Sequence, residues 1–403
     1  MKYLILVGDG MGDHPLVELG NRTPLQAAAT PVMDALSRTA QIFEVTTVPD
    51  GFHPGSDIAN MSLLGYDPAQ YYTGRAPLEA ASMGIPIAGR ETAFRCNLVT
   101  IVHEPVLTRM VDFSAGHITS EEAAELIGAV QQQCGNDWFH FHKGISYRHL
   151  LLVQDPISDM ATVPPHDYIG NDVSGPYQAY LRHPDWRELM LTAQQVLAEH
   201  PVNRRRIANG RNPATCIWPW GSGKMPAMPS LNQRFGITGT MISAVDLLNG
   251  LGVCTGLNIA QVEGATGYID TNYAGKAQAA LDALARQDFV FVHLEAPDEA
   301  GHQGRLDHKI QAIEDFDRRI VGTITEALHA RGEAFRVVVT MDHFTPLSIR
   351  THTAEPVPAL LYDSRDAGQG KDCSFAEHLL EKNPAPARVV GHRLINRLLE
   401  KEG

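Results

Sequence analysis

Cysteine is scarce in this sequence, and the few cysteines form no recognisable motif. The chain of 403 residues holds five, an odd number, and no two are arranged as CxxC. Disulfide-stapled secreted domains and structural zinc sites use dense, regularly spaced cysteines. We therefore expect reduced thiols, as in a cytoplasmic protein. The cysteines are Cys96, Cys134, Cys216, Cys254 and Cys373.

Long apolar runs are also missing. No segment reaches the roughly 18 apolar residues that a membrane-spanning helix needs. The first residues, MKYLILVGDG, contain a short apolar run that stops at Gly8 and Asp9. A signal peptide has a longer apolar region and a small-residue cleavage site. The run therefore predicts a first β-strand, and we expect no membrane partner and a cytoplasmic location.

Positive charge is not in excess. Lys and Arg number 33 against 46 Asp and Glu, a net charge of −13, which gives no electrostatic reason to expect a nucleic acid or an anionic membrane as partner. Hydrophobic residues make up 44% and charged residues 20%, close to the average of soluble globular proteins. This composition excludes a disordered chain and a coiled coil. Nucleotide-binding motifs are absent too: there is no P-loop, no protein-kinase set and no GxGxxG.

Short apolar runs rich in Val, Ile and Phe alternate with helical patterns in the two outer parts of the chain. The runs predict buried strands at Tyr3–Val7, Phe289–Leu294, Arg336–Met341 and Ala359–Tyr362. Helices are predicted over Thr23–Arg38, Ala274–Arg286 and His308–Leu328. Such alternation is typical of an α/β fold, with a mostly parallel sheet flanked by helices.

The middle of the chain, residues 88–235, has a different pattern. Strands are predicted at Asn97–His103 and Leu150–Val153, and helices at Ser120–Cys134 and Tyr177–His200, with proline-rich stretches at 156–165 and 213–229. We interpret this as a smaller α+β domain inserted into the first. The first domain is then discontinuous, with residues 1–87 and 236–403.

Acidic and histidine side chains follow three of the predicted strands. The carboxyl ends of parallel strands meet at one sheet edge, where open α/β proteins place their sites. Asp298 and His302 are four residues apart and would share one face of a helix. Each residue alone could be an ordinary helix cap or a structural histidine. Together they suffice for two divalent cations about 3.5–4 Å apart. The set is Asp9, Asp298, His302, Asp342, His343 and His352.

Ser56, in PGSDIAN, has two interpretations. Serine after glycine at the start of a helix is a preferred N-cap, and the segment by itself favours that role. It could instead be a nucleophile, provided a base or a metal activates it. No G-x-S-x-G motif is present.

Several motifs together resemble the archaeal-type cofactor-independent (2,3-bisphosphoglycerate-independent) phosphoglycerate mutases of the alkaline phosphatase superfamily. The resemblance covers residues 1 to about 362 and rests on GDGMGD, HPGSDIANMSLLGYDP, YYTGRAPLEAASMG, HLEAPDEAGHQG and THTAEPVP, among others. Other stretches resemble a bacterial subgroup proposed to be homoserine kinases. These are VPDGFHPGS, HPVNRRRIANG, IWPW and RTHTAEPVP.

The resemblance implies a fold, a metal site and a reaction. One metal would lie on Asp298, His302 and His352, and the other on Asp9, Ser56, Asp342 and His343, with Ser56 transiently phosphorylated. The implied reaction interconverts 3-phosphoglycerate and 2-phosphoglycerate, and a homoserine kinase or a phosphohydrolase on the same metals is the alternative. The ligand types suit Mn²⁺ or Zn²⁺ better than Mg²⁺. Phe344 departs from the small polar residue that commonly follows the Asp-His pair.

A phosphorylated small substrate would need positive partners in this acidic protein. Arginine can hold phosphate or carboxylate bidentately, although each candidate could also be an ordinary surface charge. The substrate-binding candidates are Arg75, Arg95, Arg148, His166 and Lys276. The insert would act as a lid that excludes water. We expect Arg204–Arg206 to form a solvated helix face, and the sequence carries no sign of the oligomeric state.

Overall fold

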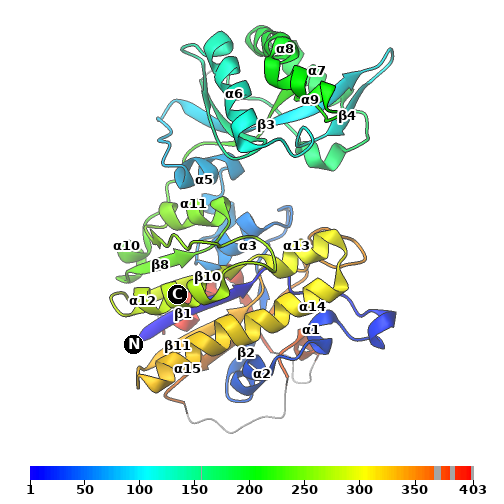
Figure 1. The fold of residues 1–403 in the computed structure, drawn as a ribbon. Coiled ribbons are helices and arrows are strands. Elements are labelled where there is room, and N and C mark those ends of the chain that lie inside the picture. Colours follow the sequence, from blue (N-terminus) through cyan, green and yellow to red (C-terminus); the bar gives the residue numbers. More distant parts are fainter. Residues whose placement is uncertain (156, 367–373, 382–385, 401–403) are drawn as a thin grey trace. The chain divides into compact units, whose positions relative to one another are not determined.

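The computed structural model describes residues 1–155, 157–366, 374–381 and 386–400. The chain divides into two compact units (Figure 1). Unit 1 consists of residues 1–72 and 227–403, and unit 2 of residues 73–226. Compared with the expected insert, unit 2 begins earlier and contains helix α5 (Arg75–Ser82), whereas residues 227–235 belong to unit 1.

Unit 1 is built on an eight-stranded sheet in the order β13-β2-β12-β11-β1-β10-β8-β9. Five neighbouring pairs are parallel, and only β12 runs antiparallel to its two neighbours. This is the mostly parallel sheet that the sequence predicts. Its strands are β1 (Lys2–Gly8), β2 (Gln41–Thr46), β8 (Gly239–Ile242), β9 (Asn258–Ile259), β10 (Phe289–Leu294), β11 (Phe335–Thr340), β12 (Val357–Asp363) and β13 (Ala387–Val390).

The three central strands end at the same level. β1 pairs Gly8 with Leu294 of β10 and Val7 with Thr340 of β11. All six residues of β10 and of β11 are buried, as near-continuous apolar runs in parallel sheets are. The residues that follow β1, β10 and β11 therefore lie side by side at the carboxyl edge of the sheet.

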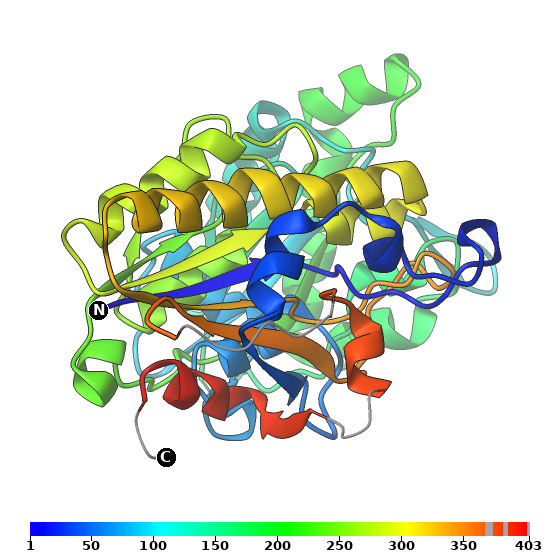
Figure 2. The same ribbon diagram turned by 90° about the horizontal axis from the view of Figure 1, so that it is seen from below.

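Helices cover both faces of this sheet. In Figure 2 the long run from α14 to α15 crosses one face, and the C-terminal segment with α16 lies on the other. The α-helices of unit 1 are α1 (Pro24–Ala27), α2 (Pro31–Ser37), α3 (Ser56–Leu63), α4 (Pro68–Tyr71), α10 (Leu231–Phe235), α11 (Asp246–Cys254), α12 (Tyr273–Leu284), α13 (Ala296–Gln303), α14 (Leu306–Asp315), α15 (Thr323–Ala330) and α16 (Leu394–Leu398). Short turns η1 (Val17–Leu19), η4 (Glu377–Glu381) and η5 (Gly391–Arg393) are 3₁₀-helical.

Two predicted helices of unit 1 differ from the structure. The helix expected over Thr23–Arg38 is broken, because Ala28 and Thr30 are non-helical before Pro31, and a residue that precedes proline avoids the helical region. The run expected over His308–Leu328 is continuous, but it contains the π-helical segment η3 (Phe316–Gly322) between α14 and α15.

Unit 2 contains an antiparallel sheet and its own core. Its long strand β3 pairs with β4, β6 and β7, and β6 pairs with β5. The core includes the fully buried Trp186 and Trp218. The elements are β3 (Glu91–His103), β4 (Thr108–Asp112), α6 (Ser120–Cys134), β5 (Phe139–His142), β6 (Arg148–Gln154), η2 (Pro165–Tyr168), α7 (Ser174–Arg182), α8 (Pro184–Glu199), α9 (Pro201–Ala208) and β7 (Cys216–Gly223).

Three expectations for unit 2 need correction. The predicted helix Tyr177–His200 splits into α7 and α8, because His183 is extended before Pro184. The proline-rich stretch at 213–229 contains strand β7. Arg206 is not solvated: it is 1% exposed, forms an ion pair with Glu122, and donates to backbone carbonyl groups.

Four cysteines lie in the described part of the chain, and all four are free thiols. Cys373 lies outside the described residues. No described helix combines the length and the apolar character that crossing a bilayer requires.

Candidate metal centre

The site forms where β1, β10 and β11 end. Asp9 follows β1, and its backbone N–H donates to the carbonyl of Leu294 at the end of β10 (2.9 Å). The next residue, Gly10, has φ = +59° and donates its N–H to Asp342 Oδ1 (3.1 Å). A Cβ at Gly10 would lie 2.6 Å from Asp298 Oδ1. Only glycine fits between these carboxylates in this backbone conformation.

Asp298, His302 and His352 form one corner of the site. Asp298 and His302 lie on helix α13, and their spacing of four places His302 Nε2 at 3.2 Å from Asp298 Oδ2. His352 Nε2 approaches the other oxygen of Asp298 (3.4 Å) and lies 2.9 Å from His302 Nε2. One carboxylate thus faces two imidazole nitrogens.

Asp9, Asp342 and His343 form the second corner, together with Ser56. His343 Nε2 lies 3.4 Å from Asp9 Oδ1 and 3.5 Å from Asp342 Oδ2. Ser56 Oγ lies 3.2 Å from His343 Nε2 and 3.4 Å from Asp9 Oδ2. Ser56 is the first residue of helix α3, whose N-cap is Gly55. The capping role that its segment favours is therefore not the role seen in the structure.

The seven residues singled out around the expected metals thus lie together, but their grouping differs in detail. Three sets offer ligand atoms within 4.8 Å of one another: Asp298 with His343 and His352, Asp9 with Asp342 and His343, and Asp9 with His293 and Glu295. His343 belongs to both of the first two sets. Each set could hold a metal ion.

His293 and Glu295 were not among the sequence candidates. His293 is fully buried within β10, with Nε2 at 3.0 Å from Asp9 Oδ2 and Nδ1 at 3.7 Å from Glu295 Oε2. A histidine inside the apolar run FVFVHL, just before the site, is the signal that could have identified it. His293 is therefore placed to orient the Asp9 carboxylate.

Two neutral side chains also support the carboxylates. Asn60, one helical turn after Ser56, donates Nδ2–H bonds to Asp342 Oδ2 (2.8 Å) and to the Ser56 carbonyl (2.9 Å). Thr345 donates its hydroxyl to Asp298 Oδ1 (2.5 Å). Nothing in the spacing of the sequence marks these two residues, because their contacts arise from distant segments.

The electrostatics of the site favour bound cations. Burial, together with the charges of Asp342, Glu295 and Asp298, raises the pKa of Asp9 well above its ordinary value. Burial also raises the pKa of Glu295 to about 8 and lowers that of His293 to about 4. Asp9 Oδ1 has no hydrogen-bond partner among the described residues. Buried, crowded carboxylates beside the neutral imidazole of His293 are an arrangement that divalent cations stabilise.

Lys276 lies behind this site rather than at its surface. Its side chain is fully buried, and Nζ donates to the carbonyl of His293 (3.1 Å). Burial lowers its pKa to about 8, while the nearby charge of Glu295 raises it. This position favours a supporting role for Lys276 over direct contact with a substrate.

The other substrate candidates belong to unit 2. Arg95 is buried, stacks over Trp220 (4.5 Å to the ring centroid) and forms an ion pair with Glu79 (3.1 Å). Burial, together with the nearby charges of Arg75 and Arg148, lowers its pKa to about 10, while the charge of Glu79 raises it. The structure thus brings the three arginines together.

His166 belongs to the same neighbourhood. Its ring lies 5.3 Å from that of Trp220 and 6.3 Å from that of Phe113, and its side chain is 45% exposed. Asn97 accepts a hydrogen bond from Trp220 Nε1 (3.0 Å). Arg75, Arg95, Arg148 and His166 therefore surround one aromatic, positively charged patch of unit 2.

Comparison with known proteins decides the family. The sequence model for 2,3-bisphosphoglycerate-independent phosphoglycerate mutase matches residues 38–203. A probable mutase of this name from Geobacter sulfurreducens is 48% identical over 403 residues, covering all of both chains. The chain belongs to the 2,3-bisphosphoglycerate-independent phosphoglycerate mutases. A mutase of the family from Methanosarcina barkeri is likewise 48% identical and covers 95% of both chains.

Solved structures agree with this membership of the phosphoglycerate mutase family. A protein from Pyrococcus horikoshii superposes with a TM-score of 0.81 at 26% identity, over 100% of this chain and 99% of that one. A cofactor-independent phosphoglycerate mutase from Thermoplasma acidophilum has a TM-score of 0.61 at 29% identity, over 99% of both chains. The resemblance found in the motifs and the α/β fold expected from it are confirmed.

Phe344, which departs from the mutase family's usual pattern, has a clear packing role. It is 6% exposed and pairs with Met11, Gly12 and Thr353 in isolated β-bridges. A Cβ at Gly12 would lie 2.3 Å from the Phe344 ring. Phe344 thus ties the loop after β1 to the loop after β11, next to the site.

Proposed function

We propose that this protein interconverts 3-phosphoglycerate and 2-phosphoglycerate without a bisphosphoglycerate primer, through a phosphorylated Ser56. The observation that carries the proposal is the position of Ser56. Its hydroxyl lies 3.2 Å from His343 Nε2 and 3.4 Å from Asp9 Oδ2, within a buried set of aspartates and histidines. The family membership supports the choice of substrate.

The proposed metal ligands are Asp298, His302 and His352 for one divalent cation, and Asp9, Ser56, Asp342 and His343 for the other. Two bound cations would neutralise charge on the phosphoryl oxygens and favour ionisation of the Ser56 hydroxyl. The mixture of carboxylate and imidazole ligands favours Mn²⁺ or Zn²⁺ over Mg²⁺.

The chain's own residues position the nucleophile and the phosphoryl group. Ser56 opens α3, so a phosphoryl group on it would lie at the positive end of a helix. Asn60 fixes the Ser56 carbonyl and Asp342 at once. Ser56 would attack phosphorus in line, and the glycerate would then take the phosphoryl group back on its other hydroxyl.

The patch on unit 2 is the proposed site for the rest of the substrate. Arg75, Arg95 and Arg148 supply guanidinium groups for a carboxylate or phosphate, and His166 is the candidate for proton handling. Unit 2 would also exclude water during the lifetime of phosphoserine, which separates a mutase from a phosphohydrolase.

Three reactions measured on the same preparation test the proposal. We expect interconversion of the two phosphoglycerates without bisphosphoglycerate, little phosphate release, and no ATP-dependent phosphorylation of homoserine. Ser56→Ala should lower the rate by up to about 10⁶-fold. Ser62→Ala, a buried serine on the same helix, is the matched control. Phosphorylation of homoserine without isomerisation would replace the proposal by the kinase alternative.

Arg148→Ala tests the proposed patch. Without this arginine the glycerate should be held less firmly, while the metal site can still accept phosphate, so the ratio of phosphate release to isomerisation should rise. Arg109→Ala, which removes an exposed arginine paired with Glu104 in unit 2, should leave the ratio unchanged. Both products are measured in one mixture. An equal fall of both reactions would assign Arg148 no part in holding the glycerate.

A further inference from the structure

A carboxylate lies between two of the arginines proposed to bind the substrate. Glu79 is on helix α5, four residues after Arg75, so the two side chains share one face of that helix. Glu79 Oε1 lies 3.7 Å from Arg75 Nε, and Oε2 lies 3.1 Å from Arg95 Nε of strand β3. Each oxygen of this carboxylate therefore faces a different guanidinium group.

The Glu79 carboxylate is partly removed from solvent. Its side chain is 13% exposed, and that of Arg95 is 7% exposed. Helix α5 is fixed against the sheet of unit 2, because Ala76 and Ala80 form one buried cluster with Ala93 of β3. Ion pairs in such a place are screened less by salt and water than exposed surface pairs, which contribute little. Glu79 can therefore hold both guanidinium groups in place.

Arg95 is held from a second side by an aromatic ring. Its guanidinium group stacks over Trp220 (4.5 Å to the ring centroid), and Trp220 Nε1 in turn donates to Asn97 Oδ1 (3.0 Å). The contact of Arg95 Nε with Glu79 is an ion pair rather than an aligned hydrogen bond. Neither Nη1 nor Nη2 of Arg95 has a hydrogen-bond acceptor among the described residues. These two outer nitrogens can therefore donate to a bound anion.

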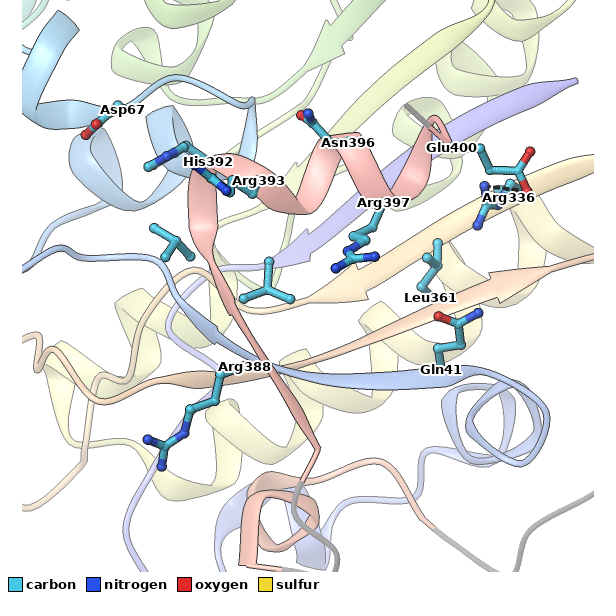
Figure 3. A pocket seen from close by; sticks show the side chains of 12 residues that line it. Gln41, Asp67, Arg336, Leu361, Arg388, His392, Arg393, Asn396, Arg397 and Glu400 are labelled. Atoms are coloured by element: carbon cyan, nitrogen blue, oxygen red, sulfur yellow. Dashed lines mark ion pairs between the residues drawn. The ribbon is translucent and has the colours of Figure 1, made fainter. Parts of the chain in front are cut away.

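The balance of charge at Glu79 differs from that at another arginine pair of the chain. At the cavity of unit 1 in Figure 3, Arg336 lies beside Glu400 (3.0 Å). Arg336 and Arg365 share two carboxylates there, Glu400 and Asp363, so the charges cancel. At Glu79 one carboxylate faces two arginines. The positive charge that remains favours an anionic ligand.

We propose that Glu79 is a positioning residue, which holds Arg75 and Arg95 so that both guanidinium groups donate to the carboxylate of phosphoglycerate. This role rests on the proposed function, which assigns the phosphoryl group to Ser56 and leaves the carboxylate as the other anionic group of the substrate. A guanidinium group whose plane is fixed binds a carboxylate bidentately. Glu79 acts through the two arginines and does not itself contact the substrate.

Removing the charge of Glu79 has two opposite effects on the binding of an anion. A neutral side chain beside the arginines leaves more positive charge, which by itself would strengthen binding of any anion. Loss of the fixed arginine geometry would weaken binding of a ligand that carries a carboxylate. Glu79→Gln has nearly the same size but presents one carbonyl and one NH₂ group, so the sign of its effect distinguishes the two.

Calorimetric titration of the metal-loaded Ser56→Ala protein tests this role, because that parent protein binds ligands without turnover. The ligands are 3-phosphoglycerate and glycerol 3-phosphate, which lacks the carboxylate. We expect Glu79→Gln to weaken binding of 3-phosphoglycerate about tenfold, as for a lost hydrogen bond to a charged group, and not to weaken binding of glycerol 3-phosphate. Glu91→Gln, whose carboxylate accepts from Ala88 N–H and Gln154 in the same unit, should change neither affinity.

Two further variants show whether geometry or charge is responsible. Glu79→Asp keeps the charge but shortens the side chain, so it should also weaken binding of 3-phosphoglycerate, and it replaces Glu79→Gln if that variant does not fold. In an Arg75→Ala background Glu79→Gln should have a smaller effect, since only Arg95 remains to be held.

Three results would overturn the role of Glu79. These are tighter binding of 3-phosphoglycerate by Glu79→Gln, the same factor with and without Arg75, and equal affinity of the parent protein for the two ligands. Isomerisation is assayed separately with Ser56 in place. A wild-type enzyme that does not isomerise phosphoglycerate overturns the proposed function, whereas an active isomerase whose affinities Glu79→Gln leaves unchanged overturns only the role of Glu79.

Discussion

Lys309 offers the sharpest structural prediction, because it joins the two loops that carry the metal centre. It is fully buried, and Nζ donates to the Gly12 carbonyl (3.0 Å), to the Thr345 carbonyl (2.8 Å) and to Asp13 Oδ2 (2.8 Å). Gly12 follows Asp9, and Thr345 donates to Asp298. One ammonium group therefore fixes both the loop after β1 and the loop after β11.

Lys309→Met should keep the packing and remove the charge. It leaves the buried Asp13 carboxylate without its cation, and breaking one partner of a buried ion pair costs about 3–5 kcal/mol. Asp13 would still accept from the backbone N–H groups of His14 and Leu347, so we expect the lower end of this range. The affinity for divalent cations should also fall, since two ligand-bearing loops lose their common donor.

Denaturant unfolding followed by far-UV circular dichroism measures this loss. All four tryptophans are in unit 2, so their fluorescence reports on the other unit and serves as an internal comparison. The double variant Asp13→Asn/Lys309→Met contains no unpaired buried charge and should recover at least half of the loss. A cost below about 1 kcal/mol for Lys309→Met, or strictly additive costs in the double variant, would refute the reasoning.

Two further predictions concern stability. His149 is buried and accepts a hydrogen bond from the Gly144 N–H, and burial lowers its pKa from 6.5 to about 4. As the pH falls, the His149 imidazole therefore takes up a proton in the unfolded chain before it does so in the folded one. The free energy of unfolding should fall by up to about 3 kcal/mol as the pH drops from 6.5 to 4. With unfolding followed by tryptophan fluorescence, the free energy of unfolding should depend less on pH in His149→Gln than in the wild type. The same pH dependence in both proteins would contradict this prediction. Asp317 accepts from the N–H groups of Val32 (3.2 Å) and Met33 (2.7 Å) at the start of α2. Asp317→Ala should therefore cost about 1–2 kcal/mol in denaturant unfolding, and Asp317→Asn should cost less; equal costs would deny the capping role.

The sequence predicted best what depends on local pattern. The buried strands β1, β10 and β11 are continuous apolar runs, and the register of a parallel sheet then brings Asp9, Asp298 and Asp342 to one edge. Proline decided where two predicted helices break, before Pro31 and before Pro184. In both places the helical periodicity of the sequence continues through a proline, whereas the residue before a proline avoids the helical conformation.

The features that were missed depend on tertiary contacts. Strand β7 contains Pro219, a residue rare inside sheets, yet it pairs with β3, and Pro219 lies opposite Cys96. A charged residue such as Arg206 is expected at the surface from its sequence alone, but Glu122 and three backbone carbonyls pair with it in the core of unit 2. Lys276 belongs to a matched motif, and only the fold shows its ammonium group buried behind His293.

The same distinction holds at the site. The spacing of Asp298 and His302 on a helix is local information, and the structure brings these side chains together as that spacing indicates. His293, Asn60 and Thr345 support the site through contacts between residues 47 to 284 positions apart in the sequence. Contacts between such distant residues produce no periodic pattern in the sequence.

A rapid-quench experiment tests the central claim most directly. Substrate carrying ³²P in its phosphoryl group is mixed with the metal-loaded enzyme, the reaction is stopped with acid within one turnover, and the labelled peptide is identified by mass spectrometry. The account predicts phosphoserine at Ser56, formed and consumed at least as fast as the product appears, and none in Ser56→Ala. Full isomerisation without any label on Ser56, or label on another residue that Ser56→Ala leaves unchanged, would contradict it.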